Sequence, residues 1–84
     1  MKSVERKQLK AKAHHLRPII RIGKAGVTDS LIQQIDRVLK DHQLIKLQFD
    51  AHKERRKELS LEITSKSGAE IVSLVGHVLT IYKE

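Results

Sequence analysis

The stretch IIRIGKAGVTDSLIQQIDRVLKDH, residues 19–42, decides the fold. Its first residues, 19–22, predict a short strand that ends at a glycine, and residues 23–26 form a Gly-x-x-Gly loop. Thr28 then suits the cap of a helix, because its hydroxyl can accept a hydrogen bond from a free backbone N–H of the first turn. One side of this helix carries apolar residues at helical spacing, ending in a histidine: Leu31, Ile32, Ile35, Val38, Leu39 and His42. Strand, loop and capped helix together predict an α/β unit.

The segment after this helix contains a second predicted strand and an ambiguous region. Residues 44–49 are apolar enough for a central strand of a sheet. Within residues 50–67, every second residue from Leu59 to Ile63 is apolar, as in a strand, whereas the many Lys, Arg and Glu residues favour a helix and Gly68 suits its C-terminus. We expect a helix, because a sheet that is parallel in part needs a crossover connection here.

The C-terminal residues complete the predicted domain. Residues 71–75 and 78–82 predict two strands, and Gly76 at the first position of the turn between them permits a type II′ hairpin. The predicted order of elements is therefore α-β-α-β-α-β-β. This order corresponds to a single compact α/β domain over residues 1–84 with a four-stranded mixed sheet.

The N-terminal segment is predicted to be a basic helix. Ser3 can cap a helix that runs to about His15, and Pro18 prevents its continuation. At roughly 100° per residue, one stripe of this helix is apolar and the adjoining arc is cationic. The stripe consists of Leu9, Ala13 and Leu16, and the arc consists of Arg6, Lys7, Lys10, His14 and Arg17.

Charge is distributed unevenly along the 84 residues. The formal net charge is +7, and residues 1–24 hold eight cations and one anion, whereas residues 25–84 hold nine of each. This asymmetry points to a polyanionic partner, nucleic acid or an anionic membrane surface, although a solvated basic face without a partner would show the same pattern. The chain has no Cys and no apolar run long enough to cross a bilayer. We therefore expect a cytoplasmic protein with no membrane segment.

The Gly-x-x-Gly loop is the strongest candidate for a binding site. Glycines let backbone N–H groups approach a phosphate closely, the helix N-terminus behind the loop adds partial positive charge, and Lys24 adds a full charge. By itself this pattern also fits an ordinary structural loop. Arg17 and Arg21 lie just upstream, and the cationic arc of the first helix is expected to reach the same side, so several phosphates could be contacted at once.

No motif in the chain predicts catalysis or cofactor binding. Neither G-x-x-x-x-G-K-[ST] nor G-x-G-x-x-G occurs, and the five His residues include no H-E-x-x-H. The Ser and Thr residues fall at predicted caps and turns, away from any acid or base partner. We expect no enzyme activity, no metal and no cofactor. The two aromatic residues are too few for a stacking platform, so binding should depend on the phosphate backbone and on shape.

Several short segments also occur in a characteristic order along the chain. They are Leu9-Lys10, Ala13-His14-x-Leu16-Arg17-Pro18, Ile22-Gly23-Lys24-x-Gly26-Val27-Thr28, Leu44-Ile45-Lys46, and Gly76 with Tyr82. This set covers nearly the whole chain and resembles the CRM domain, the chloroplast RNA splicing and ribosome maturation domain, in its stand-alone YhbY-like form. The resemblance implies an RNA-binding α/β domain, similar to the C-terminal domain of a translation initiation factor. It also implies association with precursors of the large ribosomal subunit and assistance in assembling that subunit.

Charge and resemblance together give an expected RNA-binding set. The family loop is similar to the RNA-binding loop of KH domains, although here it joins a strand to a helix. The expected residues are Arg6, Lys7, Lys10, His14, Arg17, Arg21, Gly23, Lys24, Ala25, Gly26 and Lys46. Two other functions stay open at this point: a DNA-binding or general RNA-chaperone role, and a protein-interaction adaptor that uses the face of the sheet.

Overall fold

The computed structural model describes residues 3–84 and contains the predicted elements in the predicted order. One short 3-10 helix, η1, precedes the third helix. The elements are α1 (Ser3–Ala13), β1 (Pro18–Ile22), α2 (Asp29–His42), β2 (Leu44–Phe49), η1 (Lys53–Arg55), α3 (Arg56–Ser67), β3 (Glu70–Val75) and β4 (Val78–Tyr82).

The four strands form one mixed sheet in the order β1-β2-β4-β3. β1 runs parallel to β2, and the other two neighbouring pairs are antiparallel. β2 is an inner strand, as its apolar composition predicts. α2 is the crossover between the parallel neighbours, and α3 leads from β2 to β3, which lie on either side of β4. A helix over the ambiguous region is therefore confirmed.

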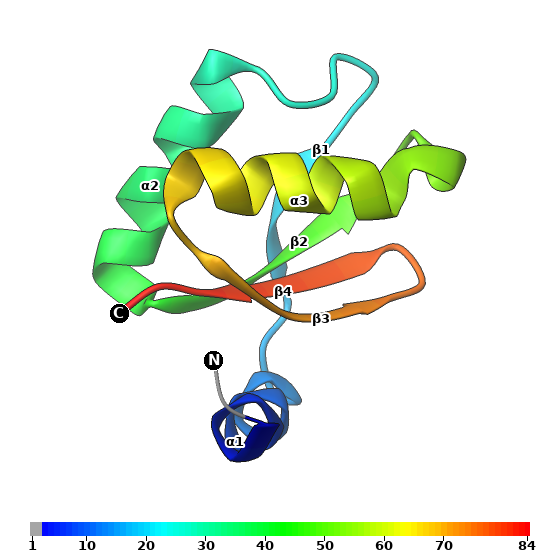
Figure 1. The fold of residues 1–84 in the computed structure, drawn as a ribbon. Coiled ribbons are helices and arrows are strands. Elements are labelled where there is room, and N and C mark those ends of the chain that lie inside the picture. The colour runs from blue at the N-terminus through cyan, green and yellow to red at the C-terminus, as the bar shows by residue number, and fades with distance from the viewer. Residues whose placement is uncertain (1–2) are drawn as a thin grey trace.

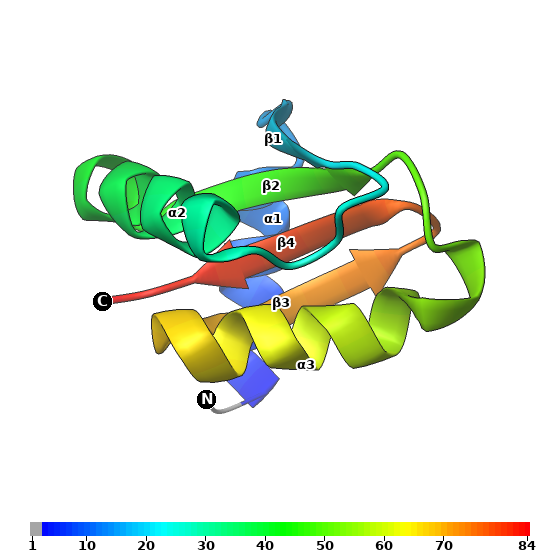
Figure 2. The same ribbon diagram turned by 90° about the horizontal axis from the view of Figure 1, so that it is seen from above.

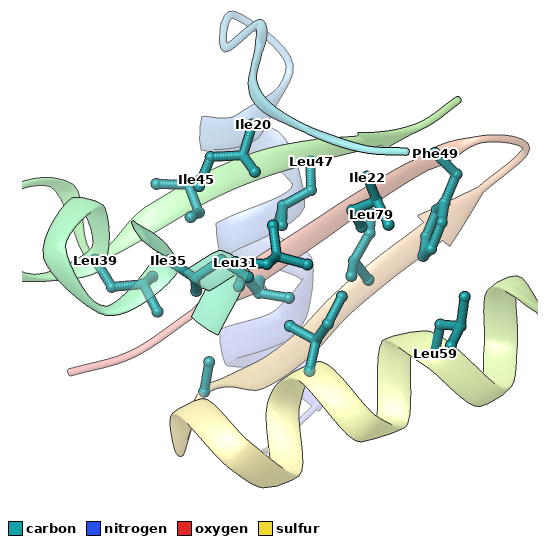
Figure 3. Packing of buried hydrophobic residues seen from close by; sticks show 13 residues of the cluster. Ile20, Ile22, Leu31, Ile35, Leu39, Ile45, Leu47, Phe49, Leu59 and Leu79 are labelled. Atoms are coloured by element: carbon teal, nitrogen blue, oxygen red, sulfur yellow. The ribbon is translucent and has the colours of Figure 1, made fainter. Parts of the chain in front are cut away.

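The helices cover both faces of the sheet (Figures 1 and 2). α2 and α3 lie on one face, and α1 lies on the other. Every second residue of β2 is buried, starting at Ile45, and these side chains join the main core beneath α2 and α3 (Figure 3). Ala13 and Val72 are also buried but lie outside that cluster. Because α1 contacts β2 and β3, we place these two side chains in a smaller apolar layer under α1.

The two inner strands pair regularly, and the two outer strands do not. Between β2 and β4 the register is continuous. β1 shifts register against β2 between Pro18 and Ile20, and β3 shifts against β4 between Ile71 and Ser73. Each edge of the sheet therefore carries an irregularity of the kind that bends and twists a strand.

Three predicted turn and cap residues are confirmed by their backbone geometry. Thr28 has extended dihedral angles, and its Oγ1 accepts a hydrogen bond from the Leu31 N–H at 3.1 Å. Gly68 ends α3 in the left-handed region, with φ +77°. Gly76 has φ +57° while His77 does not have a positive φ, which is the combination that a type II′ turn requires.

Other local predictions were wrong at the ends of helices. Ser3 lies within α1 (Ser3–Ala13), so it is a helical residue and not the cap. The helix ends at Ala13, because the chain must turn before the strand that starts at Pro18, and this leaves His14 in that turn. Leu16 follows the helix and its side chain is exposed. His42, the last residue of α2, is exposed as well.

Thr28→Ala should destabilise the protein by about 1 kcal/mol, because the Leu31 N–H would lose its only acceptor in the first turn. Thr28→Ser keeps the hydroxyl and should unfold close to wild type. Ser30→Ala is the matched control, because Ser30 is an exposed hydroxyl residue two positions later, inside the first turn of α2. Urea unfolding monitored by circular dichroism measures all three. Equal stability of Thr28→Ala and Ser30→Ala would show that the cap contributes nothing.

Candidate nucleic-acid interface

The Gly-x-x-Gly loop, residues 23–26, is a tight turn at the end of β1. The Gly26 N–H donates to the Gly23 carbonyl at 3.0 Å, which places Lys24 and Ala25 at the tip. Gly26 has φ +70°, a backbone conformation that residues other than glycine rarely adopt. In the described part of the chain, the backbone N–H groups of Lys24 and Ala25 have no hydrogen-bond acceptor. The tip therefore presents two backbone donors and one ammonium group to solvent.

This geometry corrects two details of the predicted phosphate cradle. The Gly26 N–H is used inside the turn, so it is not a donor that a phosphate would meet. The N-terminus of α2 also contributes less positive charge than expected, because exposed Asp29 lies in its first turn and offsets the helix dipole. The available donors are instead the tip amides and the side chain of Lys24.

His52, 28 residues after Lys24 in the sequence, forms a hydrogen bond with the loop. The His52 ring nitrogen Nε2 lies 2.9 Å from the Lys24 carbonyl oxygen. A carbonyl only accepts, so the imidazole donates this hydrogen bond and carries a proton on Nε2. A Cβ atom built on Gly26 would lie 3.6 Å from the same nitrogen. His52 itself has φ +61°, which makes it one of two non-glycine residues with positive φ among those described.

Arg21, on β1 just before the loop, is exposed but has a carboxylate beside it. Its guanidinium forms an ion pair with the Asp50 carboxylate at 3.6 Å, and the Gln48 side-chain amide donates a hydrogen bond to the same carboxylate at 2.8 Å. The Asp50 N–H donates to the carbonyl of Ile22, which ties this acidic residue to the end of β1. Arg21 is therefore a partly neutralised cation, a feature that its position in the sequence does not reveal.

The other expected binding residues lie on the α1 side of the sheet. We call them the α1-side cations: Arg6, Lys7 and Lys10 on α1, His14 and Arg17 after it, and Lys46 on β2. All except Lys46 are exposed. Lys46 is half-buried, and the alternation along β2 turns it toward the face that α1 covers. In the register of the sheet Lys46 lies opposite Pro18, at the start of β1.

The α1-side cations and the loop do not form one cluster. β1 is an extended strand that carries the chain away from α1, and the loop lies at its far end (Figure 1). At ~3.3 Å per residue, the strand separates Arg17 from Lys24 by roughly 20 Å. The expectation that the cationic arc of α1 reaches the same side as the loop is therefore wrong. Any ligand that contacts both must extend along β1.

The two flanks of α1 differ in charge. A groove of about 610 Å³ between α1 and the end of β4 is lined on the helix side by Glu5, Gln8 and Lys12. At roughly 100° per residue, Arg6 and Lys10 fall on the opposite flank. Among the described residues of α1 the one carboxylate is Glu5, at the groove, so the flank with Arg6 and Lys10 is the side of the helix that can attract a polyanion.

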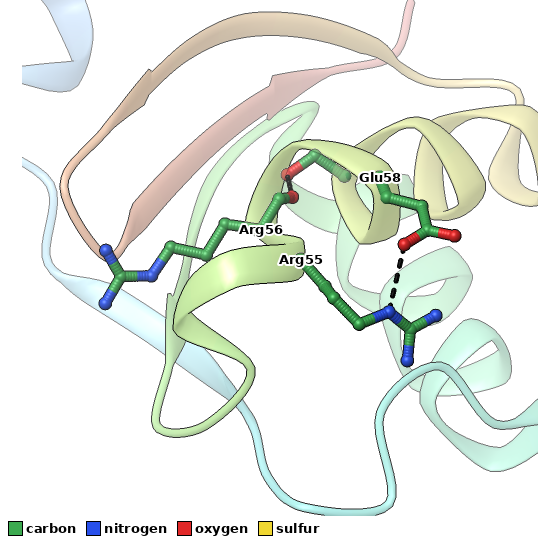
Figure 4. Close-up of polar contacts among 4 residues, drawn as sticks. Arg55, Arg56 and Glu58 are labelled. Carbon is green, nitrogen blue, oxygen red and sulfur yellow. Dashed lines mark hydrogen bonds and ion pairs between the residues drawn. The ribbon is translucent and has the colours of Figure 1, made fainter.

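A second group of cations, not predicted to bind RNA, lies where η1 meets α3. Arg55 donates a hydrogen bond to Glu58 at 2.9 Å (Figure 4). This hydrogen bond and the charge of the guanidinium lower the pKa of the exposed Glu58 carboxyl. Arg56 points away from that pair (Figure 4), and its Nε is buried without a hydrogen-bond partner. The sequence indicates this group by the charged run from Lys53 to Lys57. It was not predicted as a binding site because the secondary structure of residues 50–67 was ambiguous.

Residues 3–84 contain neither a metal-binding cluster nor a membrane-spanning helix. These residues contain no group of three or more His, Cys, Asp or Glu side chains that could hold a metal ion. No helix among them has the length and apolar character needed to cross a membrane. The expectation that the protein works without a metal or cofactor stays a prediction.

Comparison with known proteins gives a consistent result. A family model described as the CRS1 / YhbY (CRM) domain matches residues 1–83. A probable RNA-binding protein of Methanocaldococcus jannaschii is 37% identical over 81 residues, which are 93% of this chain and 60% of that protein. A probable RNA-binding protein of Bacillus subtilis is 33% identical over 81 residues, 95% of this chain and 84% of that one.

Structural comparison supports the same relationship. The solution structure of a hypothetical Staphylococcus aureus protein, described provisionally as RNA binding, matches with a TM-score of 0.86 and 30% sequence identity. The match covers 100% of this chain and 88% of that chain. The α/β fold with three helices and a four-stranded mixed sheet is thereby confirmed independently.

Proposed function

Because this chain belongs to the CRS1 / YhbY (CRM) domain family, we propose that it is an RNA-binding protein whose interface extends along β1. The relatives described above carry names that refer to RNA binding, which supports this assignment. The observation that carries the proposal is the line of exposed cations from the flank of α1, through Arg17, to Lys24 at the loop tip. Such a line matches the spaced negative charges of a nucleic-acid backbone.

In this proposal the protein contacts mainly RNA phosphates and recognises the shape of the RNA, with few contacts to bases. Phe49 is buried in the core and Tyr82 is half-buried at the end of β4, so the described surface offers no aromatic platform for stacked bases. Structured RNA, whose backbone geometry is fixed, therefore suits this surface better than a flexible single strand read base by base.

The finer assignment follows from the resemblance to the stand-alone CRM domain. We propose that the RNA is a precursor of ribosomal RNA and that the protein assists assembly of the large ribosomal subunit in the cytoplasm. The relatives are named for RNA binding and not for a catalytic activity, and the absence of enzyme activity in this chain stays a prediction. Crosslinking in cells followed by sequencing of the bound RNA tests this assignment directly. Recovery of messenger RNA in place of ribosomal precursors would contradict it.

The salt dependence of the RNA-binding constant tests the proposed phosphate contacts in vitro. If about five phosphates are neutralised, log K should fall against log salt with a slope of roughly −3.5 to −4.5, the shallower value applying to single strands. Fluorescence anisotropy with a labelled ribosomal RNA fragment measures this slope. A duplex DNA of equal length is the control, and it should bind more weakly. A flat salt dependence would indicate that base stacking or protein contacts dominate, against binding through phosphates. Equal binding of DNA would support a general nucleic-acid binder, and no binding of either nucleic acid would leave the protein-interaction adaptor.

A further inference from the structure

The segment that follows β2 contacts the Gly-x-x-Gly loop through His52. We call residues 52–57 the α3-side segment. It contains His52, which contacts the loop, and then four cations and one anion within five residues, a net charge of 4 − 1 = +3. Figure 2 shows the connection between β2 and α3 beside the loop, and the bond from His52 to Lys24 fixes that proximity.

We propose that the α3-side segment completes the RNA site: His52 is a positioning residue for the loop, and Lys53 and Lys57 contact phosphates. The inference rests on the proposed RNA-binding function. It adds to the site two lysines at the start of α3, beside the loop, for which no RNA-binding role was expected from the sequence.

The positioning role of His52 follows from the direction of its hydrogen bond. By donating to the Lys24 carbonyl, the imidazole holds this oxygen against the protein. A free carbonyl at the tip would repel phosphate, whereas the tip amides attract it, so this bond fixes the orientation in which the loop binds anions. His52 keeps a backbone conformation that non-glycine residues rarely adopt, and such strain persists only where surrounding contacts maintain it.

The binding role of the lysines follows from their surroundings. Arg55 is committed to Glu58, and the Nε atom of Arg56 is buried. Lys53 and Lys57 are exposed, and neither has a carboxylate within ion-pair distance in the described part of the chain. Two cations without a local partner, one of them directly after the residue that holds the loop, are suited to a polyanion that passes over the loop tip.

The experiment compares three variants in the anisotropy titration with the ribosomal RNA fragment. His52→Gly removes the imidazole and also relieves the strained backbone, so the protein should fold. Its affinity should fall roughly two- to tenfold, the effect of one lost hydrogen bond. Its salt slope should stay at the wild-type value, because no phosphate contact is removed. Lys53→Gln with Lys57→Gln should instead make the slope shallower by roughly 1.4–1.8.

Lys40→Gln with Lys66→Gln is the matched control. These exposed lysines lie in the last turns of α2 and α3, so the net charge falls equally at a distance from the loop, and the slope should not change. If wild type binds RNA but His52→Gly and the Lys53/Lys57 variant behave like this control, the inference is wrong and the proposed function stands. A shallower slope for His52→Gly would make His52 a phosphate contact and overturn its positioning role. Failure of wild type to bind would refute the proposed function itself.

Discussion

Gly26→Asp should lose RNA affinity by at least roughly tenfold, because it places a carboxylate at the loop where phosphate is expected, and juxtaposed like charges cost more than 1 kcal/mol. The same substitution should lower stability by about 1 kcal/mol, since residue 26 has φ +70°. The space itself is not the obstacle, because a Cβ atom there would make only an ordinary contact with His52. Both quantities can be measured on one preparation, by anisotropy and by thermal unfolding.

The two glycines of the loop allow charge and strain to be separated. Gly23 does not have a positive φ, and a Cβ atom built on it meets nothing within 4 Å. Gly23→Asp therefore adds the charge without the strain, and Gly26→Ala adds the strain without the charge. We expect Gly23→Asp to weaken RNA binding while its stability stays close to wild type. Gly26→Ala should instead lower stability while its RNA affinity stays close to wild type. Lys24→Ala should fold normally and reduce the salt slope by ~0.7–0.9, as one lost phosphate contact.

A purely structural loop would give a different pattern. In that case both substitutions at Gly26 would lower stability, and none of the variants would change the RNA affinity of the folded protein. Unchanged affinity of folded Gly23→Asp and Gly26→Asp would sink the phosphate-binding role of the loop.

The triple variant Arg6→Gln, Lys10→Gln and Arg17→Gln should also lose at least roughly tenfold in affinity, with a salt slope shallower by about 2–3. All three side chains are exposed, so the free energy of unfolding should change by less than about 1 kcal/mol. Anisotropy titrations at several salt concentrations and urea unfolding measure the two quantities.

A matched variant separates local contact from net charge. Arg37→Gln, Lys40→Gln and Lys66→Gln remove the same charge from the exposed surfaces of α2 and α3, across the sheet from α1. This control should bind nearly as wild type at physiological salt. If both triple variants lose affinity equally, α1 is not part of the interface and only the overall charge matters.

Features set by neighbouring residues could be predicted from the sequence. The cap at Thr28, the left-handed Gly68 and the hairpin glycine Gly76 each depend on a few adjacent positions, and each was predicted correctly. The apolar side of α2 was predicted for the same reason, and it faces the core except at His42, which is exposed at the end of the helix.

Features set by distant residues could not be predicted. The bond from His52 to Lys24 joins positions 28 apart, and nothing in either local sequence indicates it. The pairing of Arg21 with Asp50 likewise depends on β1 and β2 lying side by side in parallel. The side of the sheet on which α1 packs depends on the path of the chain before β1, and a helical wheel does not contain that information. The sequence therefore indicates which residues are candidates for RNA binding, but it does not indicate which of them lie close together in the fold.

The irregular outer strands bear on how the molecule behaves at high concentration. An exposed strand edge invites pairing with the edge of another copy, which is a route to aggregation. Here β1 begins with a proline that has no N–H to donate and carries the cation Arg21, while β3 shifts its register against β4. Both edges thus disfavour strand-to-strand addition without a covering layer along the sides of the sheet. The β1 edge is left accessible to a ligand that binds through charge and not through backbone pairing.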